Sequence, residues 1–327
     1  MGTARCGADG KNEVREMACL SEELTFLSAD GKSGVFARIW RPDHAQPKFI
    51  LQICHGMCEY IDRYAEFAEY IVERGGVVCG NDHLGHGFTK QRNKDSSYGY
   101  FADKNGEKLV MEDVHSLTVL IRGRYPGIPF ILMGHSMGSM VARSYMTKYG
   151  SEPACAVFMG TSGANRLTGL IRFLANAGML SGRAKKPATL LSHLAFSKYN
   201  DRYGDVRSKN DWITRDRERV GRYNADPQCT FLFTDRAAYD FANLVDDVSG
   251  IQWAGRMPKD RPCLLVSGSM DPVGNYGEGV KEVFGWMKEE GLPVEMKLYE
   301  GARHELLNET NREEVFADLF TWIQKHI

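Results

Sequence analysis

The sequence lacks the features that mark several classes of protein. Its formal net charge is only −1 over 327 residues, so it has no basic excess with which to bind nucleic acid, and no such partner is expected. No stretch approaches the roughly 20 consecutive apolar residues that span a bilayer. The first 19 residues carry six charges and no apolar core of signal-peptide length, which predicts a cytoplasmic protein.

The eight cysteines follow neither a disulfide framework nor a zinc-site spacing. Several stand inside apolar, strand-like runs, which favours buried and reduced thiols. Cys54 and Cys58 lie four positions apart and flank His55 and Gly56, so a redox or metal role there is the less favoured alternative. The sequence also shows no internal repeat and no low-complexity tract.

The sequence does contain a regular alternation of apolar runs and helical periodicity. Hydrophobic residues make up 43% of a chain long enough for one large α/β domain or two ordinary ones. We expect strands over 24–27, 35–40, 49–54, 77–80, 130–133 and 154–159, with helices over 61–73, 107–122 and after the fifth strand. This order predicts a mostly parallel sheet with helices on both faces and a site at the carboxyl ends of its strands.

The alternation stops near Gly160 and resumes at Arg261, with strands over 262–268 and 294–299 and helices over 279–288 and near 315–323. Residues 161–250 hold 14 Lys and Arg against 10 Asp and Glu, a net +4, whereas the remainder carries −5. We expect this insert to be a cap over a core formed by residues 1–160 and 251–327. A separate domain is the less favoured alternative, because the sheet pattern resumes after the insert.

A serine stands at the sharpest break in the pattern. Gly134-His135-Ser136-Met137-Gly138 follows a short apolar strand and precedes a helical spacing of apolar residues, at Val141, Ala142, Tyr145 and Met146. Gly-x-Ser-x-Gly between strand and helix is typical of a nucleophile elbow, in which the glycines let strand and helix approach closely. Ser136 is the expected nucleophile, and the backbone amide of Met137 is expected to face the developing oxyanion.

A serine nucleophile needs a base and an acid that orients the base. Asp271 and His304 each follow a predicted strand, in the Ser, Asp, His chain order that accompanies the elbow. Both should therefore lie at the same sheet edge as Ser136. The competing acids are Asp246 and Asp247, and the competing bases are His83 and His86, for which a supporting role in their glycine-rich loop is favoured.

A second oxyanion donor is expected at the end of the strand over residues 49–54. The sequence there reads His55-Gly56-Met57-Cys58-Glu59, which puts the Met57 amide close to that strand end. His55 and Glu59 could brace this loop by hydrogen bonds, or Glu59 could only supply a favourable charge at the start of the next helix. The sequence leaves both readings open.

Five motifs stand out: His55 to Glu59, Asp82 to Gly87, Gly134 to Gly138, Ser269 to Asp271 and Gly301 to His304. With them the chain resembles the bacterial-type members of the monoacylglycerol lipase and lysophospholipase group of α/β-hydrolases. The similarity covers about residues 24–327 and is weakest in the cap. It implies an eight-stranded core, a helical cap and ester hydrolysis of single-chain lipids without metal or cofactor. The resemblance implies that Ser136, Asp271 and His304 form the triad and that Met57 and Met137 are the oxyanion donors. Met57 departs from the family pattern, in which a small residue is expected at this position.

The insert contains the residues that should select the substrate. Leu167, Leu170, Ile171, Leu174 and Met179 form an apolar stripe flanked by Arg166, Arg172, Arg183, Lys185 and Lys186. One interpretation is a cap helix packed over the site, and the other is a lid in transient contact with a lipid surface. Among the aromatic residues of the insert, Phe196, Tyr199 and Phe233 are candidates for an acyl pocket.

The resulting hypothesis is a serine esterase that cleaves monoacylglycerol-like or lysophospholipid-like esters through an acyl-enzyme. The rival activities of the same fold are short-chain or aromatic carboxylesterase, thioesterase and aminopeptidase. A non-catalytic ligand-binding relative is the rival from another class. The head group, the acyl length and the oligomeric state are left open.

Overall fold

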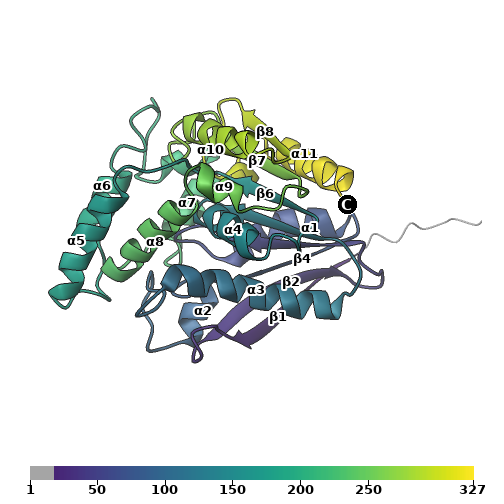
Figure 1. The fold of residues 1–327 in the computed structure, drawn as a ribbon, viewed down its shortest axis with the longest axis horizontal. Helices are drawn as coiled ribbons and strands as arrows, with labels where there is room; N and C mark the ends of the chain where they lie inside the picture. Colours follow the sequence, from purple (N-terminus) through teal and green to yellow (C-terminus); the bar gives the residue numbers. More distant parts are fainter. Residues whose placement is uncertain (1–17) are drawn as a thin grey trace, which may run out of the picture.

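The computed structural model describes residues 18–327, in which eight strands form one sheet (Figure 1). The strands are β1 (Cys19–Leu27), β2 (Gly34–Pro42), β3 (Phe49–Cys54), β4 (Gly76–Asn81), β5 (Phe130–His135), β6 (Cys155–Met159), β7 (Cys263–Gly268) and β8 (Val294–Tyr299). Their spatial order is β1-β2-β4-β3-β5-β6-β7-β8. The pairs from β4 through to β8 are parallel, whereas the pairs β1–β2 and β2–β4 are antiparallel. The expected mostly parallel sheet is confirmed, while the expectations for the first 17 residues lie outside the described part of the chain.

The central strands are buried along their whole length, and this explains their unbroken apolar sequences. Every residue of β3, β4, β5, β6 and β7 is buried. Parallel strands covered by helices on both faces have no solvent side, so they show no alternation of polar and apolar residues. The hairpin strand β1 alternates half-buried and exposed residues, as expected for a strand at the sheet edge.

Two layers of helices cover the two faces of the sheet. One apolar cluster includes α3 (Gly106–Arg124), α4 (Met137–Lys148) and α10 (Glu278–Glu289), and the other includes α1 (Ala65–Val72) and α11 (Arg312–Lys325). The helix expected over residues 61–73 begins as the 3₁₀ turn η1 (Ile61–Tyr64). A short helix, α2 (Gly87–Arg92), occupies part of a stretch for which no element was expected, because its sequence is polar.

The segment between β6 and β7 is helical. It contains α5 (Thr168–Leu180), α6 (Thr189–Phe196), η2 (Asp211–Ile213), α7 (Arg217–Ala225), α8 (Asp235–Asp247) and α9 (Ile251–Gly255). Figure 1 shows α5 and α6 at the far edge of the molecule, beside α8 and away from the sheet. None of the described helices combines the length and the apolar character needed to cross a membrane.

Only part of the apolar stripe expected on α5 packs against the rest of the protein. Ile171 and Leu174 pack against a small cluster that joins α5 and α6 to α8, whereas Leu167 and Leu170 are about half exposed. The outer side also carries four further apolar side chains of α5 and α6, namely Phe173, Leu180, Leu190 and Leu194. Positions 167, 170, 171 and 174 are three and four apart and so share one side of a helix. The stripe therefore lies across the border between the packed and the exposed sides of α5.

The described cysteines are all free, at positions 19, 54, 58, 79, 155, 229 and 263, and Cys6 lies outside the described residues. Burial raises the pKa of the Cys54 and Cys58 thiols far above the ordinary value. A thiol held in its protonated form is a poor nucleophile and a poor metal ligand. Their environment therefore favours the expected inert, reduced state over a redox role.

The start of α4 lies in close contact with the ends of β3 and β5. A Cβ atom on Gly138 would lie 2.0 Å from the carbonyl oxygen of Cys54, and one on Gly134 would lie 2.1 Å from the carbonyl oxygen of Gly138. Since the atoms on the other side are backbone, they cannot move aside as a side chain could. Glycine is required at these two positions because the backbone of α4 lies too close to the ends of β3 and β5 to leave room for a Cβ atom.

We therefore expect Gly138→Ala to lower the free energy of unfolding by at least about 2 kcal/mol, because the added methyl group overpacks the elbow. Urea unfolding followed by circular dichroism measures this change. The matched control is Gly123→Ala in the exposed part of α3, where a Cβ meets nothing within 4 Å. That variant should be slightly more stable than the original chain, and equal stability of the two variants would contradict the close-approach argument.

Candidate active site

Ser136 stands at the junction of β5 and α4 in a strained backbone conformation. Its φ is +55° and its ψ is −123°, a region that residues other than glycine seldom occupy. Its amide donates a hydrogen bond to the carbonyl of Met159 at 2.9 Å, and the Ser139 hydroxyl donates to the Ser136 carbonyl at 2.6 Å. These bonds hold the turn, so the Ser136 side chain projects, half-buried, from the edge of the sheet.

Asp271 and His304 form a buried hydrogen-bonded pair. Nδ1 of His304 lies 2.9 Å from Oδ2 of Asp271, and Asp271 also accepts hydrogen bonds from the Ser267 hydroxyl and the Val273 amide, both at 2.9 Å. Burial disfavours the charge on Asp271, but His304 and these donors outweigh it and lower the pKa of the carboxyl. The carboxylate therefore accepts the Nδ1 proton, which leaves Nε2 of His304 free to accept another.

The order of the strands brings this pair to the side of the serine. Ser136, Asp271 and His304 follow β5, β7 and β8, and β6 lies between β5 and β7. The His304 ring lies over the end of β6, because a Cβ on Gly160 would come within 3.0 Å of its Cε1 atom. Its ring centre is 4.7 Å from that of His135, the residue before the serine. All three predicted residues therefore gather at one edge of the sheet.

The loop after β3 packs directly against the serine. A Cβ on Gly56 would lie 3.0 Å from Cβ of Ser136 and 2.6 Å from Oε1 of Glu59. The Gly56 amide donates to that same Glu59 oxygen at 2.5 Å, so Glu59 does brace the loop by a hydrogen bond. Met57, the next residue, is half-buried, and Met137, the first residue of α4, is buried.

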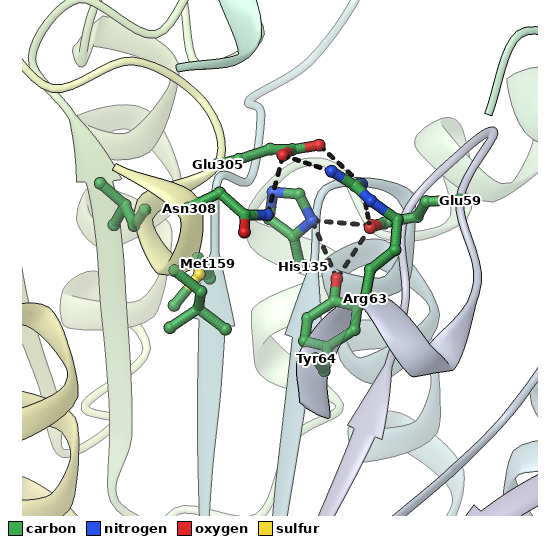
Figure 2. A pocket seen from close by; sticks show the side chains of 9 residues that line it. Glu59, Arg63, Tyr64, His135, Met159, Glu305 and Asn308 are labelled. Atoms are coloured by element: carbon green, nitrogen blue, oxygen red, sulfur yellow. Dashed lines mark hydrogen bonds and ion pairs between the residues drawn. The ribbon is translucent and has the colours of Figure 1, made fainter. Parts of the chain in front are cut away.

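Behind the loop, Glu59 belongs to a buried network of charged residues (Figure 2). Its carboxylate accepts from the Arg63 guanidinium at 2.8 Å, the Tyr64 hydroxyl at 2.9 Å and Nδ1 of His135 at 2.9 Å. Arg63 also makes a two-bonded ion pair with Glu305, at 2.8 and 2.7 Å. The cavity among these side chains is about 10 Å³, the space of about one water molecule.

The network favours the protonated form of His135. Burial disfavours the protonated ring, but the Glu59 carboxylate outweighs burial and raises the pKa of His135. Its Nε2 atom lies 3.3 Å from the carbonyl oxygen of His304. Each ring nitrogen thus faces an acceptor, a pattern that only the doubly protonated ring satisfies completely.

His55 also braces the site, but as a neutral side chain. Its ring centre lies 4.0 Å from that of His83 and 5.3 Å from that of His86, and its Nε2 atom accepts from the His83 amide at 2.9 Å. Burial lowers the pKa of His55 to about 4 and that of His86 to about 3, and it lowers the pKa of His83 as well. These histidines hold two loops together, in keeping with the supporting role expected for His83 and His86.

The alternative acids are poorly placed for the site. Asp246 and Asp247 stand at the exposed end of α8, and Asp246 forms an ion pair with Arg172 of α5. The Asp246 carboxylate therefore holds α5 and α8 together on the outside. Asp271, in contrast, is fully buried against His304.

Aromatic residues of the insert reach the site, though not the full predicted set. The Trp212 ring lies 5.1 Å from that of His304, and Tyr199 and Phe196 pack on Trp212 at 4.9 and 6.2 Å. Phe233 belongs to a different group, buried against His86 and Phe101. Trp212 was missed because it stands in a charged segment without helical periodicity.

The chain is similar to known hydrolases over most of its length. The serine aminopeptidase S33 family matches residues 45–311. The structure of a thermostable carboxyl esterase from Bacillus coagulans, in complex with glycerol, has a TM-score of 0.88 and 31% identity, and the match covers 94% of this chain and 98% of the esterase. These similarities confirm the predicted α/β-hydrolase fold.

Two lipases match by sequence. The monoacylglycerol lipase of Mycolicibacterium smegmatis is 25% identical over 93% of this chain and 98% of its own length. The monoglyceride lipase homolog of monkeypox virus is 26% identical over 88% of this chain and 94% of its own length. The resemblance inferred from the motifs is therefore confirmed.

The raised pKa of His135 predicts a pH-dependent contribution to stability. The ion pair with Glu59 stabilises the fold fully below about pH 6.5, the pKa of an unfolded histidine, and this stabilisation is lost as the pH rises through the higher pKa of the folded state. We expect His135→Gln to lower the free energy of unfolding more at pH 6 than at pH 9, measured by urea unfolding. The exposed His193→Gln is the control, and equal effects of His135→Gln at both pH values would contradict the charged state of His135.

Proposed function

The chain belongs to the serine aminopeptidase S33 family of α/β-hydrolases, and we propose that Ser136, His304 and Asp271 are the catalytic triad with which it hydrolyses esters of single-chain lipids. The observation that carries this proposal is the buried His304–Asp271 hydrogen bond at 2.9 Å, beside a serine on a strained strand-to-helix turn. A serine hydroxyl becomes a nucleophile when a correctly oriented imidazole accepts its proton.

The proposed reaction has two steps. In the first, Oγ of Ser136 attacks the ester carbonyl, Nε2 of His304 takes the serine proton and passes it to the departing alcohol, and an acyl-enzyme forms. In the second, His304 takes a proton from water, whose oxygen attacks the acyl-enzyme, and then gives that proton to Oγ of Ser136 as the bond to the acyl group breaks and the fatty acid leaves. Asp271 keeps the ring in the required tautomer and stabilises its charged form. The amides of Met57 and Met137 would hold the oxyanion in both steps.

The proposal of a lipid substrate is supported by the relatives and by the apolar surroundings of His304. The matched relatives are named monoacylglycerol or monoglyceride lipases, and the esterase structure holds glycerol. Residues 161–250 would act as a cap over the core of residues 1–160 and 251–327. In this proposal the acyl chain contacts Trp212, which lies beside His304, and Phe196 and Tyr199, which pack on Trp212. The cytoplasmic location stays a prediction from the sequence.

We expect Ser136→Ala to lower kcat/KM for a long-chain monoacylglycerol by at least about 1,000-fold, because no other group can take the place of the nucleophile. Release of fatty acid measures the rate. Asp271→Asn should also lose most of the activity, because the amide favours the wrong tautomer of His304. Covalent labelling by a fluorophosphonate should be absent in Ser136→Ala.

Ser144→Ala, on the same helix but only partly buried, is the control and should keep full activity. Hydrolysis by Ser136→Ala at the rate of the original enzyme would exclude this mechanism. A series of acyl lengths, run beside aminoacyl amides, separates the lipid esterase from its rivals. Preference for amides or for acetyl esters would assign the chain to the aminopeptidase or the short-chain esterase instead.

The cap also offers a surface for contact with a lipid aggregate. On α5 and α6, Phe173 is 69% exposed and Leu180 is 83% exposed, beside Leu167, Leu170, Leu190 and Leu194. Arg166, Lys185 and Lys186 are exposed nearby. Apolar side chains ringed by basic residues suit the surface of an anionic bilayer, so we include transient membrane contact through this outer face of α5 and α6 in the proposal.

Replacing both Phe173 and Leu180 by serine should weaken sedimentation with phosphatidylglycerol vesicles by at least about tenfold, since two large apolar side chains no longer enter the bilayer. Hydrolysis of a soluble butyrate ester should not change. The control is Leu27→Ser at the end of β1, where leucine is 65% exposed on another part of the molecule. Unaltered sedimentation of the double variant would exclude contact through this face.

A further inference from the structure

Arg63 is shared between two carboxylates from distant parts of the chain. Its Nη1 atom lies 2.8 Å from Oε2 of Glu59, and its Nη1 and Nη2 atoms lie 2.8 and 2.7 Å from the two oxygens of Glu305 (Figure 2). The three side chains are only 13%, 4% and 6% exposed. A guanidinium that donates in parallel to both oxygens of a carboxylate fixes direction as well as distance.

Each of these carboxylates is joined to a different part of the proposed site. Glu59 accepts the hydrogen bond of the Gly56 amide, next to the proposed oxyanion donor Met57. Glu305 follows His304 directly in the chain, and its amide donates to the carbonyl of Ile213 at 2.7 Å. Arg63 therefore connects the loop of the oxyanion donor to the loop of the base.

Side chains, and not bulk solvent, surround the carboxylates of this cluster. The Arg63 guanidinium donates to both Glu59 and Glu305, and the His135 ring donates to Glu59 from Nδ1. The cavity among these side chains is about 10 Å³, which is too small for bulk solvent. Without the guanidinium, Glu305 would lose its two-bonded partner, and the two buried carboxylates would repel each other more strongly and push their loops apart.

We propose that Arg63 and Glu305 are a pair of positioning residues that set the place of His304 relative to the Met57 amide. The inference rests on the proposed function. Neither side chain touches the reacting atoms; they act through the backbone of the two loops. A displacement of about 1 Å between base, nucleophile and oxyanion donor is enough to lower a rate by about 100-fold.

The competing explanation is that the ion pair only stabilises the fold. In that case Arg63→Lys would lower the melting temperature but leave kcat unchanged when measured well below it. If the pair positions the base, kcat should fall by about 10- to 100-fold while KM changes less than about threefold, because binding of the ester does not need the aligned triad. Lysine keeps the charge but cannot donate to both oxygens of Glu305.

A matched control is the ion pair of Asp62, the residue that precedes Arg63. Arg38 on β2 makes an equally two-bonded pair with Asp62, with both distances at 2.8 Å, and Asp62 stands in the same 3₁₀ turn as Arg63. Its side chain is 15% exposed, close to the value for Arg63. Arg38→Lys loosens the same turn from its other side without touching the loops of the site, so it should leave kcat unchanged.

The test measures kcat, KM and melting temperature for Arg63→Lys, Arg63→Gln, Glu305→Gln, the double variant Arg63→Gln with Glu305→Gln, and Arg38→Lys. We expect a lower kcat in each Arg63 and Glu305 variant. The double variant should lose no more activity than the more impaired of the two single glutamine variants, because the two residues act as a unit.

Three outcomes would overturn the inference: an unchanged kcat in Arg63→Lys and Glu305→Gln, multiplied losses in the double variant, or an equal loss in Arg38→Lys. Should a glutamine variant fail to fold, Arg63→Lys against Arg38→Lys decides alone. Full activity of Ser136→Ala would instead remove the proposed function, so the two failures are distinguishable.

Discussion

The close approach of α4 to the ends of β3 and β5 is the constraint on which the site depends. A Cβ on Gly138 would lie 2.0 Å from the carbonyl of Cys54, so the first turn of the helix rests on the strand that leads into the Gly56 loop. The same contact bends the backbone at Ser136 into its positive φ. One packing interaction thus brings the serine and the loop of the proposed oxyanion donor together, and the remaining strands bring the base and the acid to them.

The core and the three central residues could be predicted from the sequence because they follow local rules. Strand β3 has the bounds expected from its apolar run, and Ser136, Asp271 and His304 each follow a strand of the parallel part of the sheet, so parallel topology alone gathers them. The helices of the insert obey no such rule. Their apolar residues serve both the contact with α8 and the outer surface, and the sequence alone could not show which of these apolar sides faces the protein.

The residues that were missed depend on contacts between distant segments. Arg63 and Glu305 are separated by 242 positions, and each reads locally as an ordinary charged residue. Trp212 is beside His304 only because η2 folds back over the site. A buried guanidinium satisfied by two carboxylates is a tertiary property, since burial of charge is tolerated only where the partners meet. Such residues become visible only when the fold is known.

The division of the site along the chain has a consequence for the protein during its synthesis. Ribosomes release a chain from its amino end, so the serine, Glu59 and Arg63 emerge long before Asp271, His304 and Glu305, which belong to the last two strands and their loops. Until β7 and β8 join the sheet, the nascent chain has a nucleophile without a base and a guanidinium with half of its partners. An incomplete chain released from the ribosome would therefore carry the elbow serine in an unactivated form, and lipid ester cleavage would begin only with the finished protein.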